Sequence, residues 1–143
     1  MKDSYFIDTN IFVYSFDLRE KEKREKAKTI IKKALRDGKG FISIQVIQEF
    51  YNVATRKFER PMPVISAKEY LDKVLMQLNV VYPTSDFIAT GLDLAATTKY
   101  SFYDSLIISA ALKADCSVLY TEDMQDGQTI RNLSIVNPLK SNE

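Results

Sequence analysis

Short apolar runs alternate with longer segments of helical periodicity, and this alternation constrains the fold of the chain more than any other feature of its sequence. Each run is apolar along its length, which is typical of strands covered by helices on both faces of a sheet. Because parallel strands need helical crossovers between them, the alternation predicts an α/β fold with a mainly parallel sheet. The predicted strands are Tyr5–Asp8, Phe41–Ile44, Val80–Tyr82, Val118–Thr121 and Ser134–Val136.

Apolar stripes and terminal signals indicate where the helices between these strands lie. Asp37-Gly38 predicts the end of the first long helix, and Ser66 and Glu69 have the spacing of a capping box at the start of a later one. The expected helices cover residues 27–37, 46–54, 67–78 and 101–115, with a further helix opening at 83–86. The chain of 143 residues has no internal repeat or linker, so residues 1–143 are expected to form a single domain.

Composition excludes several chemistries together. The chain has no histidine, which removes a Ser-His-Asp triad, a Cys-His pair and a His-ligated zinc site. Its four glycines match neither GxGxxG nor a P-loop. No apolar run is long enough to cross a membrane, and the N-terminus lacks the apolar segment of a secretory signal. With one cysteine, Cys116, in an apolar stretch, we expect a cytoplasmic protein without a membrane partner.

Charge is spread unevenly along the chain. Residues 19–39 contain ten bases and four acids, a net charge of +6, whereas residues 86–143 contain four bases and eight acids, a net charge of −4. A basic face beside an acidic pocket suits a protein that binds a polyanion and holds a cation. The alternative is an ordinary solvated helix with many charge pairs one turn apart.

Three carboxylates stand at positions where a site is expected in an open α/β sheet. Asp8 ends the first predicted strand, and it is either a metal ligand or a residue of the turn. Glu49 lies at the edge of the apolar face of its helix, where it either points into a cleft or is an exposed helix residue. Asp104 begins a helix that is apolar almost all round, and it also has the spacing of a capping-box acid with Ser101.

A second group of acids follows the fourth predicted strand. Glu122 and Asp123 repeat the strand-end position of Asp8, and Asp126 precedes Gly127 in what is otherwise a polar turn. Carboxylates that share one cleft repel each other, and a divalent cation removes that repulsion. Oxygen ligands without His or Cys favour Mg²⁺ or Mn²⁺, and such a site suits hydrolysis of a phosphodiester.

Four motifs in order make the chain resemble a known family. The chain resembles the PIN-domain ribonucleases and, in size and layout, the VapC-type toxins of bacterial and archaeal toxin–antitoxin pairs. Each motif is short, but their order and spacing cover essentially the whole chain. The motifs are residues 6–11 (Phe-Ile-Asp-Thr-Asn-Ile), 46–50 (Val-Ile-Gln-Glu-Phe), 103–107 (Tyr-Asp-Ser-Leu-Ile) and 119–123 (Leu-Tyr-Thr-Glu-Asp).

The resemblance implies a three-layer α/β/α sandwich with a mainly parallel sheet of four or five strands, and a Mg²⁺- or Mn²⁺-dependent endoribonuclease. By position it implies that Asp8 and Asp104 are the primary metal ligands, with Glu49 as the third acid and Asp123 as the fourth. Glu122 and Asp126 stay open as alternatives for the fourth acid. The groups implied to orient the carboxylates or water are Thr9, Asn10 and Thr121.

The resemblance also implies partners: an RNA substrate, an antitoxin protein that covers the cleft, and a second copy of the chain in a homodimer. From the charge of residues 19–39 we expect RNA contact by Lys23, Arg24 and Lys28. Two other functions stay open. One is a PIN-like module that binds RNA or a partner without cutting. The other is a phosphoaspartyl hydrolase with Asp8 as nucleophile, although Asn10 stands where that chemistry commonly has an acid.

Overall fold

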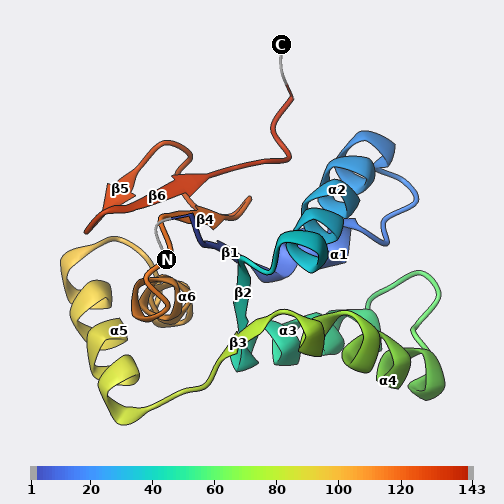
Figure 1. Ribbon diagram of the computed structural model, residues 1–143, viewed down its shortest axis with the longest axis horizontal. Helices are drawn as coiled ribbons and strands as arrows, with labels where there is room; N and C mark the ends of the chain where they lie inside the picture. The colour runs from blue at the N-terminus through green and yellow to red at the C-terminus, as the bar shows by residue number, and fades with distance from the viewer. Residues whose placement is uncertain (1–2, 142–143) are drawn as a thin grey trace.

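A sheet of six strands runs through the molecule in the order β3-β2-β1-β4-β6-β5 (Figure 1). The computed structural model describes residues 3–141. Neighbouring strands are parallel, except that β5 and β6 form an antiparallel hairpin. The strands are β1 (Tyr5–Ile7), β2 (Gly40–Ser43), β3 (Asn79–Val81), β4 (Val118–Tyr120), β5 (Thr129–Ile130) and β6 (Leu133–Val136).

Helices cover both faces of this sheet. Figure 1 shows α1 to α4 on one side of the strands and α5 with α6 on the other. The helices are α1 (Thr9–Tyr14), α2 (Lys21–Asp37), α3 (Ile44–Ala54), α4 (Val64–Lys73), α5 (Ser85–Thr97) and α6 (Phe102–Lys113), with a short 3₁₀ helix, η1 (Leu75–Gln77), before β3. The predicted mainly parallel α/β/α sandwich is therefore confirmed. The expected four or five strands are six, because the two-residue strand β5 is too short to give a sequence signal.

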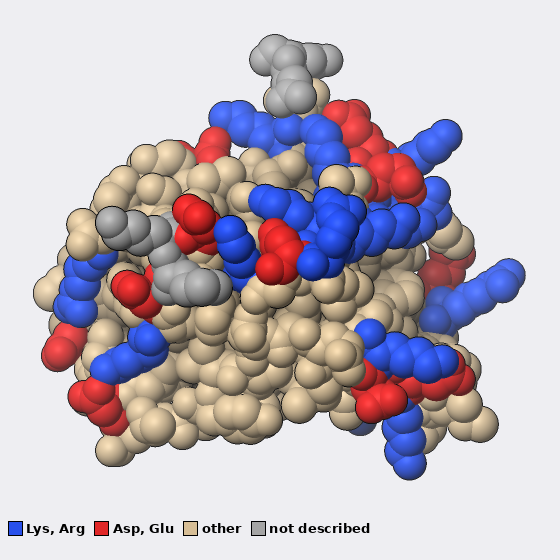
Figure 2. Space-filling view, viewed as in Figure 1, with Lys and Arg blue, Asp and Glu red and all other residues tan. Residues whose placement is uncertain are grey.

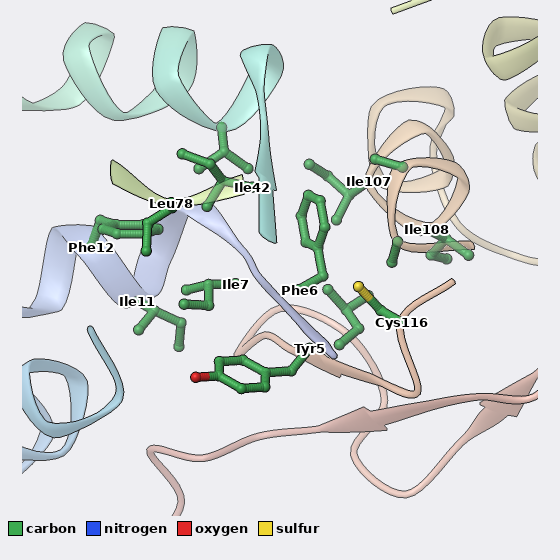
Figure 3. Close-up of a cluster of buried hydrophobic side chains, with 14 of the residues drawn as sticks. Tyr5, Phe6, Ile7, Ile11, Phe12, Ile42, Leu78, Ile107, Ile108 and Cys116 are labelled. Carbon is green, nitrogen blue, oxygen red and sulfur yellow. The ribbon is translucent and has the colours of Figure 1, made fainter. Parts of the chain in front are cut away.

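The side chains of β1 pack alternately against the two helical layers. Figure 3 shows Ile7 lying toward Ile11 of α1, whereas Phe6 lies toward Ile107 and Ile108 of α6. All of these side chains are fully or almost fully buried. A strand that is apolar on both faces is the expected result when helices cover both. This packing fixes the position of β1 at the centre of the sheet and hence the position of the residue that follows it.

The strand order places a change of direction at β1. The chain runs outward through β2 and β3 on one side of β1 and then returns to add β4 on its other side. Open α/β folds bind ligands at the carboxyl end of the strands beside such a switch point. Asp8, directly after β1, donates its backbone N–H to the carbonyl oxygen of Tyr120 at the end of β4 over 3.0 Å. The ends of β1 and β4 are therefore neighbours, which brings the acids after the two strands to the same edge of the sheet.

The segment before β3 differs from its sequence-based prediction. Ser66 and Glu69 do not form a capping box, because α4 already begins at Val64 with Pro63 in the cap position. The fixed φ of proline suits the start of a helix, so the helix begins before Ser66 and leaves it within the helix. The apolar stripe expected to reach Leu78 is also divided, since α4 ends at Lys73 and the 3₁₀ helix follows.

Two other helix ends follow the sequence signals, although α2 begins at Lys21, before the expected residue 27. Gly38 ends α2 with a left-handed φ of 71°, as an Asp-Gly pair predicts. Ser101 caps α6 by accepting a hydrogen bond from the backbone N–H of Asp104. No helix within residues 3–141 is both long and apolar enough to span a membrane.

Candidate active site

Asp8 is a buried carboxylate at the carboxyl end of β1. Only 5% of its surface is exposed. Its Oδ1 accepts a hydrogen bond from the Thr9 backbone N–H at 2.7 Å, and its Oδ2 accepts one from the Thr121 hydroxyl at 2.8 Å. Burial raises the pKa of Asp8 to about 7, with further increases from the charges of Asp123 and Glu49, while the two hydrogen bonds act in the opposite direction. Asp8 therefore caps α1, and its burial makes ionisation of its carboxyl group unfavourable.

Glu49 projects from α3 and is held on both sides. Its Oε1 accepts a hydrogen bond from the Thr9 hydroxyl at 2.9 Å, and its Oε2 accepts one from Gln45 Nε2 at 3.3 Å. Gln45 also donates to the carbonyl oxygen of Tyr103 in the first turn of α6, at 3.1 Å. Glu49 is therefore no ordinary exposed helix residue, because hydrogen bonds from Thr9 and Gln45 determine where its carboxylate lies and α6 in turn holds Gln45.

Asp104 lies in the first turn of α6. Its backbone N–H donates to the Ser101 hydroxyl at 3.1 Å, so the predicted helix cap is present. Burial raises the pKa of Asp104, and the nearby Glu49 charge raises it further, while Ser101 lowers it. The cap contact uses the backbone N–H of Asp104, so it is compatible with a site role for the carboxyl group, which lies close enough to Glu49 to feel its charge.

Asp123 follows β4 and lies at the exposed mouth of the site. Its backbone N–H donates to the Thr121 hydroxyl at 3.2 Å, so Thr121 links Asp123 to Asp8. Burial of part of its carboxyl group raises the pKa of Asp123, with additional repulsion from Asp104 and Glu122. The Asn10 amide lowers that pKa, but it lies outside hydrogen-bond geometry, so its two buried polar atoms have no partner among the residues described.

The two remaining candidate acids differ in position. Glu122 lines the same pocket as Asp8, and its Oε2 forms an ion pair with Lys23 Nζ at 2.7 Å. Asp126 lies elsewhere: its Oδ1 accepts a hydrogen bond from the Asn137 backbone N–H at 2.8 Å and its Oδ2 pairs with Lys140 at 3.4 Å. These contacts make Asp126 a residue of the loop before the β5–β6 hairpin. Its candidacy as the fourth acid is therefore not supported by its position.

The four acids implied by the sequence motifs all line one pocket of about 530 Å³. They come from four separate segments of the chain: the end of β1, α3, α6 and the loop after β4. Sequence reasoning did not single out two further residues of its wall, Tyr14 and Asp17, which follow Asn10 at helical spacing along α1 and just beyond it. The polar and charged residues that line the pocket are Asp8, Thr9, Asn10, Tyr14, Asp17, Glu49, Asn52, Asp104, Glu122 and Asp123.

The donors in this pocket suit a hard divalent cation in chemistry and charge. Within residues 3–141, no three Asp, Glu or Cys side chains are arranged closely enough to form a ready-made metal cluster. Mg²⁺ does not require one, because it usually keeps several waters and binds one or two carboxylates together with substrate phosphates. The raised pKa of Asp8, Asp104 and Asp123 and the unpartnered Oδ1 of Asn10 are the features that a bound cation would relieve.

The fold is shared with several solved structures at low sequence identity. A toxin–antitoxin complex from Klebsiella pneumoniae aligns with a TM-score of 0.70 and 20% identity over 94% of this chain and 98% of that one. VapBC-1 from nontypeable Haemophilus influenzae aligns with a TM-score of 0.64 and 21% identity over 95% and 98%. VapC20 from Mycobacterium tuberculosis, a toxin that cleaves the sarcin-ricin loop, aligns with a TM-score of 0.62 and 21% identity over 84% and 90%.

The family itself is shown by sequence. No curated protein matches the chain. The family model described as the PIN domain matches residues 5–125, which include the four acids implied by the sequence motifs and every strand from β1 to β4. This chain therefore belongs to the PIN domain family.

Proposed function

We propose that this protein is a divalent-metal-dependent endoribonuclease and the toxin of a toxin–antitoxin pair. The observation that carries the proposal is the convergence of Asp8, Glu49, Asp104 and Asp123 on one pocket, where burial and mutual repulsion raise the pKa of three of them. A site that holds negative charge at such a cost suits the binding of a cation. The similar VapC20 is a toxin that cleaves the sarcin-ricin loop, which supports a nuclease function for this chain.

Asp8 and Asp104 are the residues that would hold the ion, with Glu49 and Asp123 beside them. Bound Mg²⁺ or Mn²⁺ would supply charge neutralisation at the scissile phosphate and lower the pKa of an attacking water. The chain itself supplies the positioning. Thr121 and Thr9 fix the two oxygens of Asp8, and the Thr9 hydroxyl and Gln45 fix those of Glu49. Such supporting hydrogen bonds keep the carboxylates in place for binding and for moving a proton.

The basic residues at one end of α2 are the proposed RNA contacts. Helix α2 has 17 residues and is therefore roughly 25 Å long. Its first turn reaches the pocket through Lys23, whereas its last turn lies by the start of β1, where Asp37 accepts a hydrogen bond from Tyr5. Arg24 and Lys28 both pair with Glu25 instead, at 3.5 and 3.8 Å. Figure 2 shows the blue side chains gathered where Figure 1 draws α2.

An antitoxin partner is proposed from the comparisons and from exposed apolar side chains. The similar structures from Klebsiella pneumoniae and Haemophilus influenzae are a toxin–antitoxin complex and a VapBC pair. Here Leu18, Val64 and Ile65 are between 68% and 76% exposed, in the segment after α1 and at the start of α4. These segments lie side by side, because the ring centres of Phe16 and Tyr70 are 5.1 Å apart. Leu18 also follows Asp17 of the pocket, so a partner on this surface would sit beside the acids.

Cleavage of RNA by the purified protein tests the proposal. We expect cutting with Mg²⁺ or Mn²⁺, none with chelator, and loss of at least a hundredfold in rate for Asp8→Asn and Asp104→Asn variants that remain folded. A folded protein that binds RNA but never cuts it would favour the non-catalytic binding module. Cutting at parental rate by both variants would overturn the metal-site assignment.

A homodimer is likewise proposed, and light scattering of the purified protein would measure its mass.

A further inference from the structure

An ion pair between residues far apart in the chain lies beside the pocket, because Glu122 lines the pocket and Lys23 pairs with Glu122. Lys23 in the first turn of α2 reaches Glu122 after β4, with Nζ and Oε2 2.7 Å apart. The same ammonium lies 4.8 Å from the centre of the Tyr14 ring. Tyr14 and Glu122 both line the pocket of the four acids. The side chains of Lys23 and Glu122 are 33% and 21% exposed, so both are partly buried but the pair is accessible from solvent.

Glu122 and Asp123, the two neighbouring acids after β4, therefore have different surroundings. Glu122 is neutralised by Lys23, whereas none of the ion pairs found within residues 3–141 includes Asp123. Asp123 instead lies near Asp104, whose charge opposes its ionisation. A carboxylate that already has a cation needs no metal, and one that faces other carboxylates does. The pair therefore separates Glu122 from the ligand set and leaves Asp123 in it.

Lys23 is also set apart from the other bases of α2. Arg24, Lys26 and Lys28 form their ion pairs with acids of α2 itself, about one turn or less away. The pair of Lys23 crosses to the pocket wall. An RNA strand that enters a pocket lined by acids is repelled by them, and a cation on the wall offsets that repulsion at one phosphate. Lys23 is the base of α2 placed to do this.

We propose that Glu122 occupies the position of an RNA phosphate: Lys23 binds a phosphate next to the scissile one, and the incoming phosphate displaces the Glu122 carboxylate from the Lys23 ammonium. This inference rests on the proposed ribonuclease function and names a specific contact within it. A carboxylate and a phosphate both accept charge-assisted hydrogen bonds from an ammonium group, so one can replace the other without a change in the position of Lys23. Glu122 then acts as a built-in competitor of the substrate.

The competition predicts opposite effects of the two partners on RNA affinity. Glu122→Gln removes the competitor and should tighten RNA binding by about two- to fivefold, the range expected for loss of a partly exposed ion pair. Lys23→Met should weaken binding and reduce the slope of log K against log salt by about 0.7, the value for one phosphate on a single strand. Lys23→Arg keeps the charge and should keep the slope. Lys32→Met is the matched control, because Lys32 is exposed on the same helix and lies more than two turns further along it.

The experiment is a double-mutant cycle on Lys23 and Glu122, read as binding of a labelled single-stranded oligoribonucleotide in Ca²⁺ at several salt concentrations. The proposal expects the gain from Glu122→Gln to be larger with Lys23 present than in Lys23→Met. Equal gains in both backgrounds would overturn it, as would weaker RNA binding by Glu122→Gln or equal slopes for Lys23→Met and Lys32→Met. Mn²⁺ titration supplies a second readout: Glu122→Gln should bind Mn²⁺ like the parent, and a loss of tenfold or more would make Glu122 a metal ligand.

Different results would contradict the ribonuclease function and the phosphate site at Lys23. If the parent binds Mn²⁺ and cuts RNA while the cycle is additive, the phosphate site at Lys23 is wrong and the ribonuclease function stands. If the parent binds neither Mn²⁺ nor RNA, both are wrong.

Discussion

The hydroxyl of Thr121 donates a hydrogen bond of 2.8 Å to Oδ2 of Asp8 and joins the carboxyl ends of β1 and β4. The Thr121 hydroxyl oxygen also accepts a hydrogen bond from the backbone N–H of Asp123. Thr121 is itself fully buried, so this bond is shielded from water. One side chain thereby sets the relative positions of two acids that come from opposite ends of the chain.

Thr121→Val is expected to weaken metal binding without unfolding the protein. Valine has nearly the same shape but no donor, so the ionised form of Asp8 loses a hydrogen bond that lowers its pKa. Loss of such a supporting contact typically costs ten- to a hundredfold in metal affinity. Mn²⁺ titration at pH 7.5 measures the change, and Thr121→Ser, which keeps the hydroxyl, is the control. Equal affinity of the valine and serine variants would contradict the role given to this bond.

The metal-free protein is expected to lose stability as the pH rises toward 7. The folded-state pKa of Asp8 is about 7, against 3.8 for the free side chain. Between these values the folded protein binds a proton that the unfolded chain has released, so the free energy of unfolding falls with rising pH and stays low above pH 7. The full loss from this group is at most about 4 kcal/mol.

Asp8→Asn isolates that effect, since an amide carries no charge at any of these pH values. In chelator, the variant should be more stable than the parent at pH 8, and the difference should shrink toward pH 5. Urea unfolding at the two pH values measures both free energies. Parallel pH profiles for the parent and the variant would show that the burial of Asp8 does not carry this penalty.

Much of the site was predictable from sequence because its residues occur at element boundaries. Asp8 and Asp123 follow apolar runs, and Asp104 follows a cap signal, so their local positions could be expected. The Lys23–Glu122 pair could not be, because the two residues are 99 positions apart and only the adjacency of β1 and β4 brings α2 to the loop after β4. The position of Glu49 was predictable in part: its helix was expected, but the orientation of its side chain depends on hydrogen bonds from Thr9 and Gln45.

The errors in the predicted fold have local physical causes. Ser66 and Glu69 have the residue types of a capping box, but Pro63 begins the helix earlier, so the pattern falls inside it. The strand β5 has two residues and exists through its pairing with β6, which no local pattern encodes.

Neutralising Lys23, Arg24 and Lys28 together is expected to weaken RNA binding and flatten its salt dependence. Since only Lys23 reaches the pocket wall, Lys23→Met alone should account for most of the loss. Fluorescence anisotropy over a range of salt concentrations measures both variants against the parent. An unchanged salt slope in the triple variant would rule out RNA contact by this end of α2.

Two glycine substitutions are expected to differ in cost although both sites are crowded. A Cβ at Gly40 would lie 2.6 Å from the Cβ of Ala34, which cannot move without its helix, whereas a Cβ at Gly91 would lie 2.7 Å from Leu106 Cδ2, the end of a flexible side chain. Gly40→Ala should therefore cost about 1–3 kcal/mol in the free energy of unfolding, and Gly91→Ala clearly less. Urea denaturation of the two variants gives the comparison, and the reverse order would contradict the packing of α2 on β2.

Mn²⁺ binding to purified, folded protein tests most directly the claim that the four acids form one metal site. Isothermal titration of the parent should show binding, and Asp8→Asn and Asp104→Asn should each lose at least tenfold in affinity. Asp126→Asn provides the matched control, because Asp126 lies outside the pocket and contacts Asn137 and Lys140; it should bind as the parent does. Parental affinity in Asp8→Asn and Asp104→Asn, or a comparable loss in Asp126→Asn, would contradict the account.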